Sequence, residues 1–334
     1  MRIFILIIFL YMGISACENK NYKVLTIGGL TMGTTYSIKI KITNIKINRA
    51  QIQTDVEKIL YEVNQAMSTY LKESELSYIN SSTHIESHPI SNDLYMVINH
   101  ADTVSQLTNG AFDVTVGTLV NLWGFGPIQS TNQIPSNEAI KSIKNNTGYQ
   151  KIYLNKSQRS ITKLHPDLYI DLSGIAKGFA VDKIALYLDE NGFENYLVEI
   201  GGELIAKGFN ENNKIWQIGI ESPNNNIMKI IGLKDIAMAT SGNYKNYFEK
   251  DGVRYSHTIN PNTGKPIKHK LASVTVVDKS AMNADALATA FMVLGPEKTL
   301  LLANDLEIGV YLIIKNDERF YEDYNEYFKP YLTN

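Results

Sequence analysis

The stretch from Leu168 to Gly208 most constrains the fold, because it predicts a strand, a polar turn, a helix and a second strand in immediate succession. An apolar run over residues 168–170 is typical of a buried strand. Gly192 predicts the end of the helix, since glycine adopts the left-handed conformation at low cost. Residues 196–200 predict the second strand. The helix itself is predicted from an apolar stripe at Val181, Ile184, Ala185 and Leu188.

The polar turn of this stretch places Asp171 and Lys177 beside the predicted N-terminus of the helix. Backbone N–H groups and the helix dipole favour an anion at such a position. The alternative is an ordinary connector whose polar residues only cap the helix. These residues alone favour the connector.

Composition supports a globular protein with a sizeable core, since 44% of the 334 residues are hydrophobic and 20% are charged. The length allows one large domain or two tightly joined ones. The net charge is −2 and the basic residues are not clustered, which argues against nucleic acid as a partner. Strands and helices alternate irregularly, without repeats or a linker, so an α+β fold is expected.

The first residues predict a secretory signal, because Arg2 precedes a short apolar run and small residues before Cys17. Cys17 is the only cysteine, and its position resembles a bacterial lipobox. We therefore expect a signal peptide over residues 1–16, lipidation of Cys17, and a tether over residues 17–30. A plain signal peptide with an incidental cysteine is the alternative. The catalytic domain is then expected over residues 31–334.

Periodicity and breaker residues predict the remaining elements. Loops are expected over residues 67–80, and a small-residue turn over residues 239–244. Helices are predicted over residues 48–67, 91–107, 137–145, 280–294 and 297–304. Strands are predicted over residues 36–42, 151–154, 159–162, 216–220, 228–231, 273–277 and 309–313.

Two groups of residues could carry chemistry. Asp285 and Thr289 lie four positions apart on one predicted helix face and could supply oxygen ligands to Mg²⁺. Taken alone, an aspartate near a helix N-terminus more often stabilises the helix dipole. His257 could act as a general base, since imidazole titrates near neutrality, or it could be an ordinary loop histidine.

Eight short blocks in a fixed order resemble one family, the FAD:protein FMN transferases, formerly called thiamine biosynthesis lipoproteins. Each block is weakly specific alone, but their order and spacing together are a strong signal. The blocks are TMGTTYSI, MSTYLKESELSYIN, GAFDVTVGTLVNLWGFG, DLSGIAKGFAVD, LVEIGGE, SGNY, SHTINPNTG and NADALATA, from Thr31 to Ala290.

The resemblance implies an enzyme that uses Mg²⁺ to split FAD, joins FMN to a threonine or serine of a target protein, and releases AMP. It implies an α+β fold of interleaved subdomains, with mixed sheets and packed helices. The metal site would comprise Asp285, Thr289, the Gly174 carbonyl and position 288, where some members carry a second carboxylate and this chain has Ala288. The FAD site would comprise Met32, Tyr70, Ala111, Phe112, Asp113, Asp171, Lys177 and Ile259.

Three activities fit this resemblance. The first is transfer of FMN to a protein, with His257 as base or as a phosphate contact. The second is a Mg²⁺-dependent FAD pyrophosphatase that uses water as acceptor. The third is a flavin-binding lipoprotein without chemistry, which Asp285, Thr289 and Lys177 argue against, since storage needs no metal at the phosphates. The expected location is the extracytoplasmic, periplasmic side of a bacterial membrane.

Overall fold

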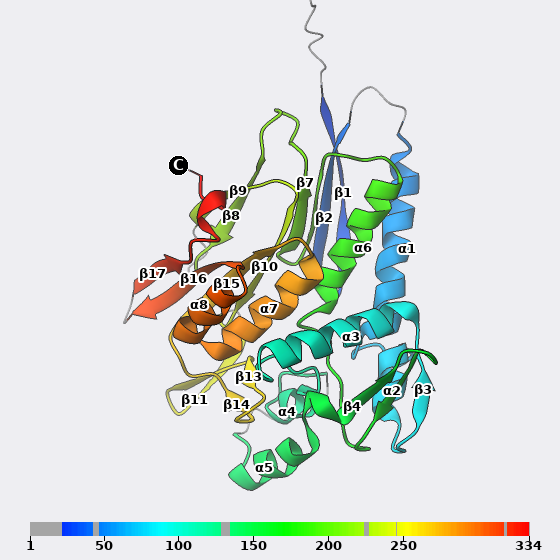
Figure 1. The fold of residues 1–334 in the computed structure, drawn as a ribbon, viewed down its shortest axis with the longest axis vertical. Helices are drawn as coiled ribbons and strands as arrows, with labels where there is room; N and C mark the ends of the chain where they lie inside the picture. Colours follow the sequence, from blue (N-terminus) through cyan, green and yellow to red (C-terminus); the bar gives the residue numbers. More distant parts are fainter. Residues whose placement is uncertain are drawn as a thin grey trace, which may run out of the picture.

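The computed structural model describes residues 22–42, 47–127, 134–223, 227–244, 246–316 and 319–333. The predicted signal peptide and the lipidation site Cys17 lie outside these ranges. Within them, no helix is both long enough and apolar enough to cross a membrane. The architecture is α+β, as predicted, with helices packed on a large antiparallel sheet and several small sheets beside it (Figure 1).

The central sheet has eight strands in the order β1-β2-β6-β7-β10-β15-β16-β17. Each neighbouring pair is antiparallel, so side chains of one strand alternate between the two faces. The strands are β1 (Lys23–Thr31), β2 (Thr34–Ile42), β6 (Tyr196–Ile200), β7 (Glu203–Lys207), β10 (Ile236–Gly242), β15 (Leu271–Asp278), β16 (Gly309–Asn316) and β17 (Arg319–Tyr324).

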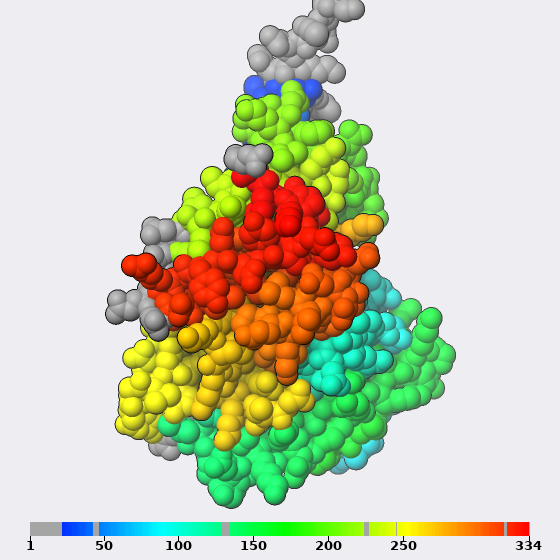
Figure 2. Space-filling view, turned by 60° about the vertical axis from the view of Figure 1, so that its left-hand side comes forward, coloured from blue at the N-terminus to red at the C-terminus, as the bar shows by residue number. Residues whose placement is uncertain are grey.

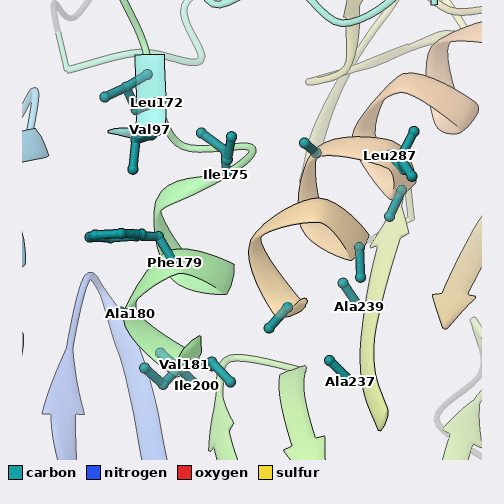
Figure 3. Close-up of a cluster of buried hydrophobic side chains, with 14 of the residues drawn as sticks. Val97, Leu172, Ile175, Phe179, Ala180, Val181, Ile200, Ala237, Ala239 and Leu287 are labelled. Atoms are coloured by element: carbon teal, nitrogen blue, oxygen red, sulfur yellow. The ribbon is translucent and has the colours of Figure 1, made fainter. Parts of the chain in front are cut away.

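Helices cover one face of this sheet and bury the main hydrophobic core. Figure 3 shows part of it, where Phe179 of α6 lies near Val97 of α3, Val181 of α6 lies beside Ile200 of β6, and Leu287 of α7 lies on the side of Ala239 of β10. The apolar stripe predicted for α6 is buried, which explains why this helix lies flat on the core. The helices are α1 (Arg49–Met67), α3 (Asn92–Leu107), α6 (Ala176–Glu190), α7 (Ala281–Leu294) and α8 (Pro296–Asp305).

A smaller core lies on the opposite face of the sheet. The hairpin of β8 (Trp216–Glu221) and β9 (Ile227–Leu233) packs there, with Trp216 and Phe328 both buried. Alternation within β16 sends Val310 and Leu312 to the helical face and Tyr311 to this one. The short helix η2 (Lys329–Tyr331) packs against β9 on this face, and Figure 2 shows the red C-terminal segment next to the orange part of the chain.

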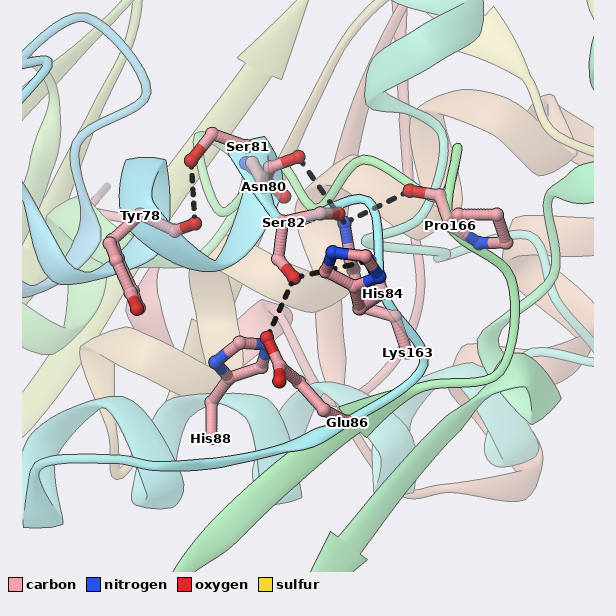
Figure 4. Close-up of polar contacts among 9 residues, drawn as sticks. All are labelled: Tyr78, Asn80, Ser81, Ser82, His84, Glu86, His88, Lys163 and Pro166. Carbon is pink, nitrogen blue, oxygen red and sulfur yellow. Dashed lines mark hydrogen bonds and ion pairs between the residues drawn. The ribbon is translucent and has the colours of Figure 1, made fainter.

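A three-stranded sheet, in the order β3-β5-β4, packs beside α2 and α3. The buried Lys163 of β5 connects the sheet to the end of α2 and to the loop after β5. Its ammonium donates to the carbonyl oxygens of Asn80, Ser82 and Pro166 at 2.9–3.2 Å (Figure 4). Burial lowers the pKa of Lys163. These elements are α2 (Glu75–Ser81), β3 (Ser87–Pro89), η1 (Tyr149–Lys151), β4 (Ile152–Asn155) and β5 (Ser160–Lys163).

A third cluster closes the lower end of the molecule as drawn in Figure 1. Leu119, Trp123, Ile140 and Ile259 are buried together there. The indole N–H of Trp123 donates to the Gly264 carbonyl at 2.9 Å and so ties two distant segments together. The elements are α4 (Gly117–Leu122), α5 (Asn137–Asn146), β11 (Tyr247–Lys250), β12 (Val253–Ser256), β13 (Ile259–Asn260) and β14 (Lys265–Pro266).

Four local predictions differ from the structure. Residues 23–30, expected in the tether, form most of edge strand β1. Residues 75–80, expected in a loop, form most of α2, with Ser74 as N-cap. Residues 168–170 make only an isolated bridge, between Tyr169 and Val116, instead of a strand. Residues 239–242, expected in a turn, continue β10, because they pair with residues 273–276 of β15.

Candidate functional site

A cavity of about 990 Å³ opens where the central sheet meets the lower cluster. Its wall is formed by segments far apart in sequence: the start of β2, the β6–β7 turn, the start of α6, the end of β10, the β13 region and α7. Seven of the eight residues predicted for the FAD site line it: Tyr70, Ala111, Phe112, Asp113, Asp171, Lys177 and Ile259.

Met32 differs from the other seven. It lies in the two-residue turn between β1 and β2, where both Met32 and Gly33 have positive φ, as a type I′ hairpin turn requires. Among the described residues, its neighbours Thr34 and Thr35 line the cavity, whereas Met32 packs against the main core. A contact between Met32 and a flavin therefore stays a prediction.

The crossing of α6 and α7 builds the floor of the site. The two helices touch at Gly178, where an added Cβ would lie 2.2 Å from the Ala281 carbonyl oxygen. This closeness lets the Gly178 N–H donate to the Asp285 carboxylate at 3.0 Å. One turn further along α6, Asp182 accepts hydrogen bonds from the Ser280 hydroxyl and from two backbone N–H groups at the start of α7.

Asp285, Thr289 and Gly174 meet at the cavity wall. Asp285 and Thr289 lie one turn apart on α7 and both line the cavity. An added Cβ on Gly174 would lie 2.9 Å from the Thr289 hydroxyl, so the backbone of residue 174 lies directly against that oxygen. A carboxylate, a hydroxyl and a main-chain carbonyl are hard oxygen donors of the kind that Mg²⁺ accepts.

Ala288 does not belong to this group. Its side chain is buried in the main core, and residue 288 is not among those that line the cavity. Its place on α7 explains this, because a position adjacent to Thr289 is turned about 100° away around the helix. The Ala288 side chain offers no ligand, because it is a methyl group on the core side, and a contribution of Ala288 to the metal site stays a prediction.

Lys177 lies in the first turn of α6, among carboxylates. Its ammonium is 3.4 Å from Oε1 of Glu203, and Nζ also donates to the Ser173 carbonyl at 3.4 Å. Burial alone would lower the pKa of Lys177, but the carboxylates of Asp285 and Glu203 outweigh burial and raise it. Lys177 therefore stays charged at neutral pH.

The pKa values of the two partner carboxyls are raised as well, in their case by burial. Burial raises the pKa of Asp285, which the charge of Lys177 and the Gly178 N–H oppose. Burial likewise raises the pKa of Glu203, and the charge and hydrogen bond of Lys177 oppose this rise. Sequence reasoning did not single out Glu203 as a site residue. The signal was a carboxylate placed directly after Gly201 and Gly202, at the start of a strand.

Carboxyl side chains outnumber lysines in the described part of the cavity wall. Among the residues that the structure describes, two lysines, Lys39 and Lys177, line the cavity beside six carboxyl side chains: Asp113, Asp171, Glu199, Glu203, Glu221 and Asp285. Such a wall repels a phosphate group unless a cation offsets the carboxylates. The oxygen donors and the charge therefore both fit a divalent cation beside Asp285.

Asp113 shapes the wall near Phe112. Its carboxylate accepts from the backbone N–H and the hydroxyl of Thr115, at 2.8 and 2.7 Å, and from the Tyr149 N–H at 3.0 Å. Burial nevertheless raises the pKa of Asp113. These three hydrogen bonds use much of the accepting capacity of the Asp113 carboxylate. The carboxylate therefore mainly fixes the loop of residues 111–115, from which Ala111 and Phe112 line the cavity.

Asp171 and Tyr70 lie at more open positions. The Asp171 carboxylate accepts from the Ser173 N–H at 2.9 Å, which shapes the turn before α6 as the sequence suggested. Tyr70 is 70% exposed, although its residue lines the cavity, so its ring is available at the rim. Burial and the nearby charge of Asp171 raise the pKa of Tyr70.

His257 lines the same cavity as Asp285 and Lys177. Its Nδ1 lies 2.9 Å from the Asn246 carbonyl, which can only accept, so Nδ1 carries the proton and Nε2 holds the lone pair of the neutral ring. Burial lowers the pKa of His257, and the positive charge of Lys177 adds to this. A neutral imidazole with a free Nε2 lone pair is suited to accept a proton.

A row of aromatic rings supports this histidine. Trp123, Tyr255, Phe248 and Phe125 stack in sequence with centroid separations of 5.1–5.8 Å, and the edge contact between Phe125 and His257 spans 6.3 Å. The row joins α4 and the segment after it to the β11–β12 hairpin. His257 is therefore held by packed rings as well as by its hydrogen bond.

Comparison with known proteins agrees with this arrangement. The ApbE family model matches residues 32–313. The chain is 45% identical to the FAD:protein FMN transferase of Vibrio cholerae over 96% of both chains, and 43% identical to that of Haemophilus influenzae over 95% of this chain and 94% of the other.

Solved structures show the same fold. The flavin transferase ApbE from Vibrio cholerae superposes with a TM-score of 0.87 at 44% identity, covering 93% of this chain and all of the other. The ApbE protein of Thermotoga maritima has a TM-score of 0.81 at 31% identity, with the same coverage. The family model, the sequence relatives and the solved structures agree over nearly the whole chain, and the protein belongs to the ApbE family.

Proposed function

We propose that this protein is an FAD:protein FMN transferase, which transfers FMN from FAD to a threonine or serine hydroxyl of a target protein and releases AMP. The single observation that carries the proposal is the meeting of Asp285, Thr289, Lys177 and His257 in one cavity of an ApbE-family chain. Oxygen donors, an ammonium and a neutral imidazole are what a reaction at a diphosphate needs.

Different residues of the cavity would bind different parts of FAD. Phe112 and Ile259 offer apolar surface to the ring systems, and Tyr70 offers an aromatic face at the rim. Lys177 offers a charged donor to the diphosphate. Asp285, Thr289 and the Gly174 carbonyl would hold Mg²⁺, which when bound neutralises phosphate charge and activates phosphorus as a Lewis acid.

His257 is the base in this proposal. The acceptor hydroxyl is a weak nucleophile and must lose its proton as its oxygen bonds to the phosphorus of the FMN half. The proton passes to Nε2 of His257, the P–O bond to the AMP half breaks, and AMP leaves with the bridging oxygen. The hydrogen bond from Nδ1 to Asn246 keeps the ring oriented for this transfer.

Product analysis tests the proposal. The protein is incubated with FAD and Mg²⁺, with and without a candidate target protein, and products are followed by chromatography and mass spectrometry. Transfer predicts AMP release that depends on the target, and a target heavier by one FMN minus water. FMN and AMP without a target would instead indicate a pyrophosphatase, and tight FAD binding without products would indicate a storage protein.

We also propose that Cys17 is lipidated and anchors the protein to a bacterial membrane, with the catalytic domain on its extracytoplasmic side. The support is the apolar run and the small residues before Cys17. Several acyl chains anchor a protein stably, whereas one binds only marginally. Cys17→Ser should abolish lipid labelling and release the protein from membranes. Normal wild-type protein with an unmodified Cys17 would contradict the anchor.

A further inference from the structure

Glu203 is an unusual side chain for a cavity wall. It is 4% exposed, and among the described residues its Oε2 has no hydrogen-bond partner. An unpaired buried carboxylate oxygen costs free energy. Core stability therefore does not explain this residue, and its ion pair with the ammonium of Lys177 becomes the feature to explain.

The backbone around Glu203 fixes its position. Gly201 and Gly202 both have positive φ and form the two-residue turn between β6 and β7, where Ile200 pairs directly with Glu203. The Gly202 N–H donates to the Glu199 carboxylate at 2.7 Å, which pins the turn. Glu203 thus projects from a rigid hairpin, whereas Lys177 has a long, flexible side chain.

Lys177 has two competing partners in the wall. Glu203 lies 3.4 Å from its Nζ, and Asp285 also attracts it electrostatically. If Glu203 did not hold the ammonium, Lys177 would be drawn toward Asp285. The Lys177 ammonium would then neutralise the Asp285 carboxylate, which the cation needs as a ligand. It would also move away from the part of the cavity wall where an anionic substrate binds.

We propose that Glu203 is a positioning residue, which holds the Lys177 ammonium at the cavity wall where it meets the diphosphate of FAD and keeps it from Asp285. The inference rests on the proposed function, because it takes an anionic nucleotide as the ligand of Lys177. It assigns Glu203 no contact with the substrate. Its effect on the reaction passes through Lys177.

A double-mutant cycle tests this dependence. Dissociation constants for FAD are measured by flavin fluorescence, with EDTA present, for wild type, Glu203→Gln, Lys177→Met and the double variant. Glu203→Gln should weaken FAD binding about tenfold. The double variant should bind no more weakly than Lys177→Met alone, because without Lys177 the carboxylate has nothing to position. If the role of Glu203 were purely structural, the losses of FAD affinity in the two single variants would instead multiply in the double variant.

A second measurement follows the metal. The Mg²⁺ concentration at half-maximal AMP release should rise for Glu203→Gln, because Lys177 then competes with the cation for Asp285. Glu203→Asp keeps the negative charge, so its FAD affinity and its Mg²⁺ midpoint should lie between those of wild type and Glu203→Gln. The matched control is Glu62→Gln, the same change in an exposed ion pair with Lys58 on α1, which should alter neither quantity. Thermal melts of every variant check folding.

The outcomes separate the two proposals. Wild-type protein that binds no FAD would overturn both the proposed function and the role of Glu203. Wild-type protein that binds and transfers normally, with unchanged FAD and Mg²⁺ values for Glu203→Gln, would overturn the role of Glu203 alone. Multiplying losses in the double variant would do the same.

Discussion

Asp285 receives a hydrogen bond from α6, lies one turn from Thr289 on α7, and faces the cavity. A residue that only stabilised the helix dipole would contribute about 0.3–1 kcal/mol to stability and nothing to turnover. Its burial, the close approach of Gly174 to Thr289 and the excess of carboxylates instead support a cation ligand. The two roles predict different results on substitution.

We expect Asp285→Asn to fold but to lose Mg²⁺-dependent AMP release. Asparagine keeps the acceptor for the Gly178 N–H, so the helix crossing survives, while the charge that holds the cation is gone. Thr289→Val should give a smaller defect, because water can replace a hydroxyl ligand. The measurement is a Mg²⁺ titration of FAD cleavage, with thermal melts as control. An unchanged Mg²⁺ midpoint at full turnover would show that Asp285 only caps the helix.

We expect His257→Ala to lower turnover about 10²–10⁴-fold, the usual cost of removing a general base. FAD affinity should change little, because the substitution removes no phosphate or ring contact that the proposal assigns. Turnover at saturating FAD and the FAD dissociation constant are measured together. Turnover within a few-fold of wild type would identify His257 as an ordinary loop residue.

The pH dependence of the same reaction follows from the lowered pKa of His257. A base works only when deprotonated, so kcat/KM should fall as the pH drops through that pKa. Because burial and Lys177 lower it, the acidic limb should lie below the ordinary value of about 6.5. His257→Ala should lack this limb. A wild-type limb centred above pH 7 would contradict the assignment.

At the scale of elements, strong local signals were predictable. Ser280 caps α7 and Ser91 caps α3, and the alternation of β2 and the stripe of α6 match the structure. At β1 and at residues 239–242 the errors share a physical cause, which is that pairing with a neighbouring strand outweighed weak local preference. Strand β1 contains two adjacent glycines, and β17 is mostly polar, yet each forms an edge of the central sheet.

Site residues that lie in sequence motifs could be predicted, whereas site residues defined only by contacts between distant segments could not. Asp285 and Lys177, which the resemblance to a family singled out, line one cavity together with His257. The resemblance could not reveal that Ala288 faces the core, which depends on the rotation of α7 in the packed molecule. Nor could it reveal Glu203, because the pairing with Lys177 joins β7 to α6 through space.

The crossing of α6 and α7 gives a prediction at this scale. We expect Gly178→Ala to destabilise the protein by about 1–3 kcal/mol, as overpacking does, since the new Cβ would meet the Ala281 carbonyl. Separating the helices should also weaken the Mg²⁺ response, because Asp285 lies at the same contact, 2.8 Å from that Cβ. Thermal melts and Mg²⁺ titration measure both effects.

A substitution elsewhere on α6 serves as the control. Leu186 is largely exposed, and Leu186→Ala should leave both stability and the Mg²⁺ response nearly unchanged. If Gly178→Ala behaved like Leu186→Ala, the close approach of the two helices would not be needed for the site.

At the scale of the whole molecule, the central sheet connects the N-terminal segment to the catalytic cavity. Strand β1 pairs along its full length with β2, and the start of β2 supplies Thr34 and Thr35 to the cavity wall. The next neighbour, β6, leads into the turn that carries Glu203. The segment expected to be a tether is therefore part of the scaffold of the site from Lys23 onward.

This continuity predicts where the chain can be shortened. A chain that begins at Tyr22 keeps β1 and should melt like the full-length mature protein and cleave FAD at the same rate. A chain that begins at Thr31, the boundary that sequence alone suggested, loses β1. Ile27 is fully buried, and burial of such a side chain contributes about 1.5–3 kcal/mol. Its loss would also expose the unpaired edge of β2, which favours aggregation.

We therefore expect the shorter chain to melt at lower temperature, to aggregate on size-exclusion chromatography, and to lose FAD binding as the wall at Thr34 and Thr35 loosens. The substitution Ile27→Ala in the chain beginning at Tyr22 separates the two causes. It removes buried surface but keeps the ladder between β1 and β2, so it should lower the melting temperature without causing aggregation. If the chain beginning at Thr31 melted and bound FAD like the longer one, β1 would be dispensable and the boundary at residue 31 would be correct.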